Sequence, residues 1–354
     1  MRSFLWTLSL LTIFGSHAAG DDVFKNTLTP ISEPRPILSD YPRYVEAVVE
    51  SKRFRVPTLI DDSGADLAVD SWRFIYNARG IVEVPNKLKG SKVAIIVVHP
   101  WGIDDGQGWK TPEPAGVAFG CTPEKNQLML EHARDVVNPF LQKWRKNVGL
   151  VVYSLPGKRD PIRGKMYRSV SHVPSEADRN VGRQELAAKL HAFKYEGESI
   201  PAEISLNSKH PAIDYFKAVP GLEAYQKMNP KGFWDLPIPV MKPIAVDPND
   251  VVIYDGEGYD VLKKFLIEQG IEHVFLCGYH ADMCVCSTTA GYENLRNDFN
   301  VFLVGDAVQA SLPANVTSKF STNHAVSTAS LKVLVTQVSW IKSIDDPSAA
   351  KGGE

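Results

Sequence analysis

The feature that most constrains the fold is a run of six aliphatic residues, Val93-Ala94-Ile95-Ile96-Val97-Val98. A strand without a polar residue on either face is typical of the centre of a parallel sheet that helices cover on both sides. Further short apolar runs follow at residues 150–154, 251–254, 273–276 and 301–304. Amphipathic segments separate these runs. Strands that alternate with helices predict an α/β fold with a doubly wound parallel sheet.

The expected helices lie between these runs. Pro139 should kink or restart the first of them, because proline has no N–H to donate. Helical periodicity is found at residues 126–146, 183–193, 261–269 and 326–341. Strands and helices together predict one α/β domain over residues 93–345.

A long polar stretch with scattered prolines interrupts this domain at residues 155–245. An excursion of this length is usually functional or covers a site. We therefore expect an insertion there that contributes to the pocket.

The first twenty residues have the pattern of a signal peptide. Arg2 supplies a positive end, the apolar run 4–14 is too short to span a bilayer, and Ala18-Ala19-Gly20 offers small residues for cleavage. The sequence thus predicts an exported protein, periplasmic or secreted. Residues 21–92 combine early prolines with short alternating apolar patterns, which predict an N-terminal extension in the form of a β-rich cap.

Composition excludes some partners. The chain is 44% hydrophobic and 23% charged with a net charge of −2, so electrostatics gives no reason to expect nucleic acid or a membrane surface. No apolar run after the signal peptide is long enough to cross a membrane. The expected partner is a small-molecule substrate, and a homo-oligomer stays open. Four cysteines are too few for a disulfide scaffold, although a bridge from Cys121 to Cys277 or Cys286 stays open.

The candidate nucleophile, Cys284, lies just after the strand at 273–276. Gly278 marks a sharp turn, Asp282 is placed as an N-cap, and the helical pattern then continues as far as Leu295. A thiol in the first turn of a helix has a lowered pKa, and the unpaired N–H groups there can hold an oxyanion. The alternative is a small cysteine buried in an apolar turn.

This segment resembles a known family. Gly278, the run 281–285 and Thr289-Ala290 are similar to the signature around the nucleophile of isochorismatase-like cysteine hydrolases, which include nicotinamidases and N-carbamoyl-amide hydrolases. Residues 301–307 and His324-Ala325 are similar to the regions that follow it. The resemblance implies a three-layer α/β sandwich and acyl transfer to Cys284. It also implies an oxyanion hole made by the backbone N–H groups of His280 and Cys284, beside a cis peptide bond between Tyr279 and His280.

The resemblance has a clear departure, because the family triad is an Asp, a Lys and a Cys, and only Cys284 is present. The Asp position falls on His99, the Lys position falls on Tyr254 or, with a slip of one residue, on Asp255, and Trp101 replaces a Gln. Asp104 and Asp105 are a turn too late in the loop to replace the carboxylate.

Imidazole can take the proton of a neighbouring thiol, so we predict that His99 is the base for Cys284. The side chains expected to face the substrate or the oxyanion are His280, Tyr254, Asp255 and Trp101. The predicted function is hydrolysis of a small amide, imide or related ester.

Two alternatives stay open. The first is a relative without turnover, which uses the pocket for binding or the fold as a scaffold. The second is a metal or redox site at the Cys284 cluster, with His99 and His280 as further ligands. No local ligand spacing supports a metal, so neither a metal nor a cofactor is expected.

Overall fold

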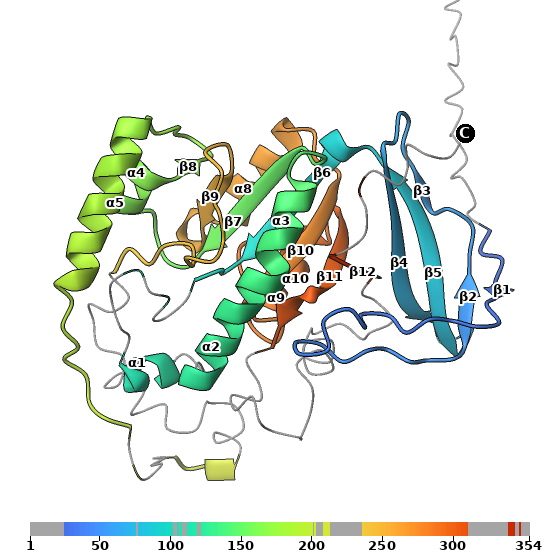
Figure 1. The fold of residues 1–354 in the computed structure, drawn as a ribbon, viewed down its shortest axis with the longest axis horizontal. Coiled ribbons are helices and arrows are strands. Elements are labelled where there is room, and N and C mark those ends of the chain that lie inside the picture. The colour runs from blue at the N-terminus through green and yellow to red at the C-terminus, as the bar shows by residue number, and fades with distance from the viewer. Residues whose placement is uncertain are drawn as a thin grey trace, which may run out of the picture.

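The computed structural model in Figure 1 describes the greater part of the chain. The described residues are 25–75, 77–101, 105, 107, 112–118, 122–200, 202, 208–212, 236–310, 339–343 and 347.

A parallel sheet forms the centre of the molecule, as the apolar runs predict. Its strands are β6 (Val93–Val98), β7 (Leu150–Leu155), β9 (Val251–Tyr254), β10 (His273–Tyr279) and β11 (Asn300–Gln309). They lie in the order β11-β10-β6-β7-β9, and every neighbouring pair is parallel. All residues of β6 and β7 are buried, so helices cover both faces. The predicted α/β class is confirmed.

The N-terminal extension lengthens this sheet at one edge. Its strands are β1 (Thr29–Pro30), β2 (Arg53–Arg55), β3 (Ile60–Asp61), β4 (Leu67–Ile75) and β5 (Gly80–Leu88). β4 and β5 form an antiparallel pair, seen at the right of Figure 1. These strands therefore continue the sheet sideways, where the sequence predicted a cap.

The junction between the two parts is β12 (Ser339–Ile341), which is parallel to β11 and antiparallel to β4. The predicted terminal helix 326–341 is thus wrong at its end, because these last residues pair as a strand. Residues 326–338 of that helix lie outside the described residues, as does His324-Ala325.

The longest helical segment of the described residues crosses the front of the central strands in Figure 1. It consists of α2 (Pro123–His132), a π-helical turn (Ala133–Val137) and α3 (Asn138–Trp144). Pro139 lies in the first turn of α3, so the predicted restart of the helix at this proline is confirmed. Trp144 packs edge-on against Phe275 of β10, with ring centroids 5.4 Å apart, and this contact fixes the helix on the sheet.

The remaining helices follow the strands. They are α1 (Glu113–Ala118), α4 (Pro161–Met166), α5 (Glu176–His191), α8 (Tyr259–Glu268), α9 (Cys284–Ser287) and α10 (Tyr292–Leu295). α5 begins earlier than predicted because Ser175 and Asp178 form a capping box. No helix in the described part of the chain has the length and apolar character needed to cross a membrane. Residues 1–24 lie outside the described residues, so the signal peptide stays a prediction.

The predicted insertion at 155–245 contains α4, a short strand β8 (Arg168–Ser169) and α5, which lie at the left of Figure 1. Its last part packs against the loop that follows β6. There the N–H of Met241 donates to the carbonyl of Pro100, at 2.8 Å. Lys242 donates its N–H to Asp105 at 2.9 Å. The insertion thus supports the loop that begins with His99.

Candidate active site

The site lies at the carboxyl ends of the parallel strands, where ligands bind in open α/β sheets. His99 directly follows β6 and has a φ of +46°. Its N–H donates to the carbonyl of Ser154 at the end of β7, at 2.8 Å. A residue in the left-handed region changes the direction of the chain. The buried imidazole of His99 therefore does not follow the alternating side-chain pattern of β6.

The imidazole of His99 meets a carboxylate from another strand end. Its Nε2 lies 2.8 Å from Oδ2 of Asp255, the first residue after β9. The hydroxyl of Thr289 donates to the carbonyl of Asp255 at 3.0 Å, which anchors this residue to the segment after α9. Cys284 lies close enough to the same imidazole to help raise its pKa. Thus Cys284, His99 and Asp255 come from three separate strand ends and lie in one cluster.

The electrostatics of this cluster favour a charged imidazole. Burial by itself lowers the pKa of His99, but the hydrogen bonds to Asp255 and Cys284 raise it to about 9. A thiol, an imidazole and a carboxylate are the residue types of a nucleophile, a general base and the group that orients that base.

The chain turns towards Cys284 at the end of β10, where Gly278 has a φ of +111°. A Cβ at Gly278 would lie 2.2 Å from the carbonyl oxygen of Val98, so only glycine fits there. The peptide bond between Tyr279 and His280 is cis, as the resemblance implied. Among the backbone hydrogen bonds of the described residues, none is donated by the N–H groups of His280 and Cys284. Within the described part of the chain, these two N–H groups are thus candidates for an oxyanion hole.

Two details of this turn differ from the sequence prediction. Met283, not Asp282, precedes α9, and it makes no side-chain cap. The helix also stops after Ser287 and resumes only at Tyr292. Polar side chains explain the break, since Thr288 Oγ1 donates to the carbonyl of Cys284 at 2.8 Å and Asn294 Nδ2 to that of Thr288 at 2.8 Å. A helix of one turn has little dipole, so it contributes little to the activation of a thiol.

The other candidates have different surroundings. The side chain of Tyr254 is buried, and the guanidinium carbon of Arg163 lies 4.7 Å from its ring centre, so Tyr254 does not face a substrate. Trp101 packs against the core and donates its N–H to the carbonyl of His99 at 2.8 Å. Asp105 is buried and accepts from Gln107 and from the N–H of Lys242, so it supports the loop and does not replace the family carboxylate. Asp104 lies outside the described residues.

His280 is buried beneath the turn. Its Nε2 lies 3.0 Å from Sδ of Met129. Burial lowers the pKa of His280 to about 4, and the nearby Lys125 and His99 also lower it. His280 is thus neutral and is not a second base.

Asp255 is the residue whose role the sequence missed. It was expected to face the substrate or the oxyanion, but one carboxylate oxygen contacts His99 and the other is buried without a partner among the described residues. The signal for it is the one-residue slip at the Lys position of the family.

Neither a disulfide nor a metal site appears at Cys284 in the described part of the chain. Cys277, Cys284 and Cys286 are free thiols, so the bridge from Cys121 to Cys277 or Cys286 that the sequence left open is not formed. Within the described ranges, the group of side chains that could hold a metal is Asp62, Glu272 and His273. His273 begins β10, at the opposite end of the strand from the Cys284 turn.

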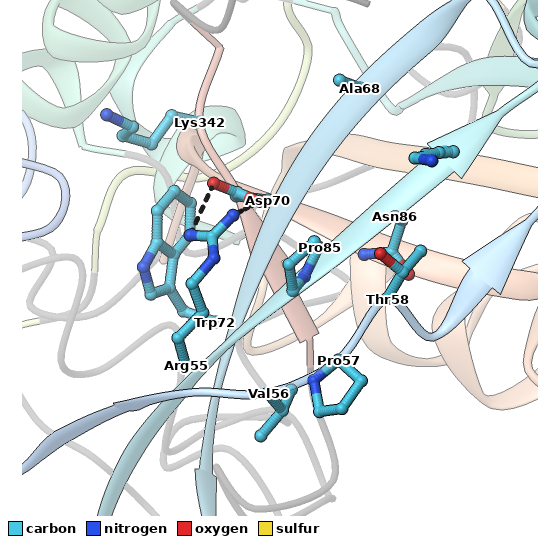
Figure 2. A pocket seen from close by; sticks show the side chains of 11 residues that line it. Arg55, Val56, Pro57, Thr58, Ala68, Asp70, Trp72, Pro85, Asn86 and Lys342 are labelled. Carbon is cyan, nitrogen blue, oxygen red and sulfur yellow. Dashed lines mark hydrogen bonds and ion pairs between the residues drawn. The ribbon is translucent and has the colours of Figure 1, made fainter. Parts of the chain in front are cut away.

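A separate pocket of about 650 Å³ lies on the N-terminal strands (Figure 2). None of the predicted site residues lines it. Arg55 pairs with Asp70 at 3.4 Å across it, and the Lys342 ammonium lies 5.6 Å from the centre of the Trp72 ring. These charged groups thus interact within the protein itself.

Comparison with known proteins adds a family match. The model of the Isochorismatase domain matches residues 207–337, which include β9, the Cys284 turn and β11 but begin after His99. No curated protein matches the chain.

Several solved structures are similar to the chain. A cysteine hydrolase from Pseudomonas syringae pv. phaseolicola is 15% identical, covers 69% of this chain and 86% of its own, and has a TM-score of 0.33. PnC1 from L. infantum, solved in complex with nicotinate, is 14% identical over 72% of this chain and 95% of its own, with a TM-score of 0.34. The nicotinamidase PncA from Bacillus subtilis is 13% identical over 69% and 96%, with a TM-score of 0.29. The chain is therefore similar to the Isochorismatase domain over residues 207–337, the part that contains β9, the Cys284 turn and β11.

Proposed function

We propose that this protein hydrolyses a small amide, imide or related ester with a triad of Cys284, His99 and Asp255. One observation carries the proposal. The imidazole of His99 lies 2.8 Å from the carboxylate of Asp255, and Asp255 and Cys284 both raise its pKa. In this triad His99 replaces the family Asp as base, and the imidazolium supplies the positive charge that the family takes from its Lys.

The acylation half of the reaction begins with the thiolate. The sulfur of Cys284 forms a bond to the carbonyl carbon of the substrate, and the carbonyl electron pair moves onto its oxygen. The N–H groups of His280 and Cys284 stabilise this oxyanion. His99 then gives its proton to the leaving nitrogen or oxygen, that bond breaks, and a thioester of Cys284 remains.

Deacylation returns the enzyme to its starting state. His99, now neutral, takes a proton from a water molecule while the water oxygen attacks the thioester carbon. The C–S bond breaks, the carboxylic acid leaves, and the thiolate and imidazolium are restored. Asp255 keeps the ring oriented in both halves and stabilises its charge.

The cellular setting is part of the proposal. The apolar run 4–14 after Arg2 supports export, and the partner is then a small molecule outside the cytosol. Fractionation of cells that express the full chain tests this, and a protein that stays in the cytosol with residues 1–20 intact contradicts it.

The experiment combines an activated ester with a panel of small amides. The panel includes nicotinamide, because nicotinamidases are among the similar structures. Wild-type protein should release a burst of p-nitrophenol from p-nitrophenyl acetate, and intact-mass measurement should show one acetyl group on Cys284. At least one amide of the panel should be turned over.

Matched variants make the result specific. Cys284→Ser should abolish the burst, whereas Cys286→Ser, a change to a buried thiol two residues away, should leave it intact. Cys284 should also react with iodoacetamide faster than Cys277 or Cys286. A folded wild-type protein that is neither acylated nor selectively alkylated at Cys284 would contradict the proposal. The binding or scaffold role would then be the remaining explanation.

A further inference from the structure

Two side chains on one face of α2 reach the turn that carries the proposed oxyanion donors. Met129 and His132 are three residues apart and therefore lie side by side on the helix. His132 contacts Tyr279 and Met129 contacts His280, so successive residues of the turn each have a partner on α2. We call Met129 and His132 the α2 pair.

The hydrogen bonds of His132 fix its tautomer. Its Nε2 lies 2.7 Å from the main-chain carbonyl of Asp306, and its Nδ1 lies 2.8 Å from the hydroxyl of Tyr279. A carbonyl can only accept, so Nε2 must carry a proton. Burial lowers the pKa of His132 to about 4, so the ring is neutral and Nδ1 has no proton.

The direction of the next bond follows from this. An unprotonated Nδ1 can only accept a hydrogen bond, so the hydroxyl of Tyr279 donates to it. The carbonyl of Met129, 3.3 Å from the same hydroxyl, is then the weaker of its two acceptors. Tyr279 is fully buried, so water cannot replace His132 as the acceptor of its hydroxyl hydrogen. The side chain of Tyr279 is thus held in one orientation by α2.

Next along the chain, His280 is held in the same way. Its ring is neutral and buried, and its Nε2 faces the sulfur of Met129, a weak acceptor. The main-chain N–H of His280 is one of the two proposed oxyanion donors. A donor of this kind has to lie within about 2.7–3.1 Å of the oxyanion to be effective.

We infer that His132 is a positioning residue for acylation: by holding the Tyr279 hydroxyl, it sets the His280 N–H relative to Cys284. The inference rests on the proposed function and adds to it a residue that touches neither substrate nor the triad. It makes α2 the support of the oxyanion hole, while β6 and β9 support the base.

The test exploits a difference between two reactions of one thiol. Attack on an ester develops an oxyanion, whereas alkylation by iodoacetamide displaces iodide and develops none. A change that misplaces the oxyanion donor therefore slows acylation by p-nitrophenyl acetate and spares alkylation. Loss of one donor in an oxyanion hole costs roughly 10²–10³ in rate.

The variants are chosen to isolate the hydroxyl–imidazole bond. Tyr279→Phe and His132→Leu should each slow acylation by about 10-fold or more, since the donor is displaced and not removed. Alkylation should stay within about 2-fold of the wild type. His132→Gln should restore most of the acylation rate, because its amide can both donate to Asp306 and accept from Tyr279.

Tyr44→Phe is the matched control. Its ring packs on His132 with centroids 5.2 Å apart, but its hydroxyl donates to Asp135 and not to the turn. It should change neither rate. If His132→Leu does not fold, Tyr279→Phe carries the test, because it removes a single oxygen atom.

The outcomes separate the inference from the proposed function. Equal losses of acylation and alkylation in Tyr279→Phe, or no loss in either, overturn the positioning role while the function stands. A wild type that is alkylated at Cys284 but never acylated overturns the function and the positioning role together.

Discussion

The two halves of the candidate site use different chemical groups: main-chain N–H groups in one half and side chains in the other. The Cys284 turn offers main-chain N–H groups and lies within the matched Isochorismatase domain. The base half consists of the side chains of His99 and Asp255, and His99 lies outside that match. The comparison shows what a substitution can change: a main-chain N–H is kept when a side chain is replaced, whereas an imidazole or a carboxylate is lost. Tests that separate the halves will therefore show which of them limits activity.

The largest effect should come from the two residues that exchange a proton. We expect Cys284→Ser and His99→Ala each to reduce acylation by at least about 10³-fold, because either change removes the nucleophile or its activation. The double variant should lose little more than either single one, since the pair acts as a unit. Independent, additive losses measured by burst kinetics would contradict the pairing. His99→Asp, which installs the family residue, should alter the activity without abolishing it.

A smaller loss is expected at the residue that orients the base. In the serine protease triad, the corresponding Asp→Asn change costs roughly 10⁴ in kcat. The Asp255 side chain is 27% exposed, so water can partly replace it, and we expect Asp255→Asn to lower the amidase kcat about 10²-fold. The change should also lower the pKa of His99. A variant with wild-type kcat would show that Asp255 only occupies the rim of the site.

Stability should depend on pH through the same imidazole. The pKa of His99 is raised to about 9, against about 6.5 in an unfolded chain, so the folded protein holds this proton more tightly. The contribution to stability is full below pH 6.5 and is lost as the pH rises through 9. The melting temperature should fall over this window. His99→Gln should flatten the decline, and an unchanged slope in that variant would assign it to other groups.

The smallest effect on activity is expected at the Lys position of the family. Tyr254→Phe keeps the ring that packs on Arg163 and should leave acylation within about 2-fold of the wild type. Tyr254→Lys should not restore a family triad. It buries an ammonium beside a guanidinium and should lower the free energy of unfolding by about 3 kcal/mol. Urea titration measures this, and a more active or equally stable Lys variant would reverse our assignment.

Much of the fold could be predicted from sequence. The runs from Val93 and from residue 273 specify buried parallel strands, because their apolar patterns leave no polar face. The end of the chain could not be read this way. Residues 339–341 join β4 to β11, and such pairing depends on distant strands and leaves no local pattern. For the same reason the N-terminal strands were expected as a cap and not as part of the sheet.

The site shows the same division. The turn before Cys284 could be predicted because its glycine and the strand before it are close in sequence. The partnership of His99 with Asp255 joins residues 156 positions apart, and only the folded sheet places them 2.8 Å from each other. The short α9 was missed because the side chains of Thr288 and Asn294 compete for backbone carbonyls, which hydrophobic periodicity does not register.

The central claim is that His99 joins Cys284 to Asp255, and an NMR titration of the histidine rings tests it most directly. With labelled histidine, and with His99→Gln to assign the signal, His99 in the wild type should titrate near pH 9. In Cys284→Ser and in Asp255→Asn it should titrate at lower pH, because each variant removes one of the bonds that stabilise the charged ring. A wild-type His99 that titrates near or below 6.5, unchanged in both variants, would contradict the triad.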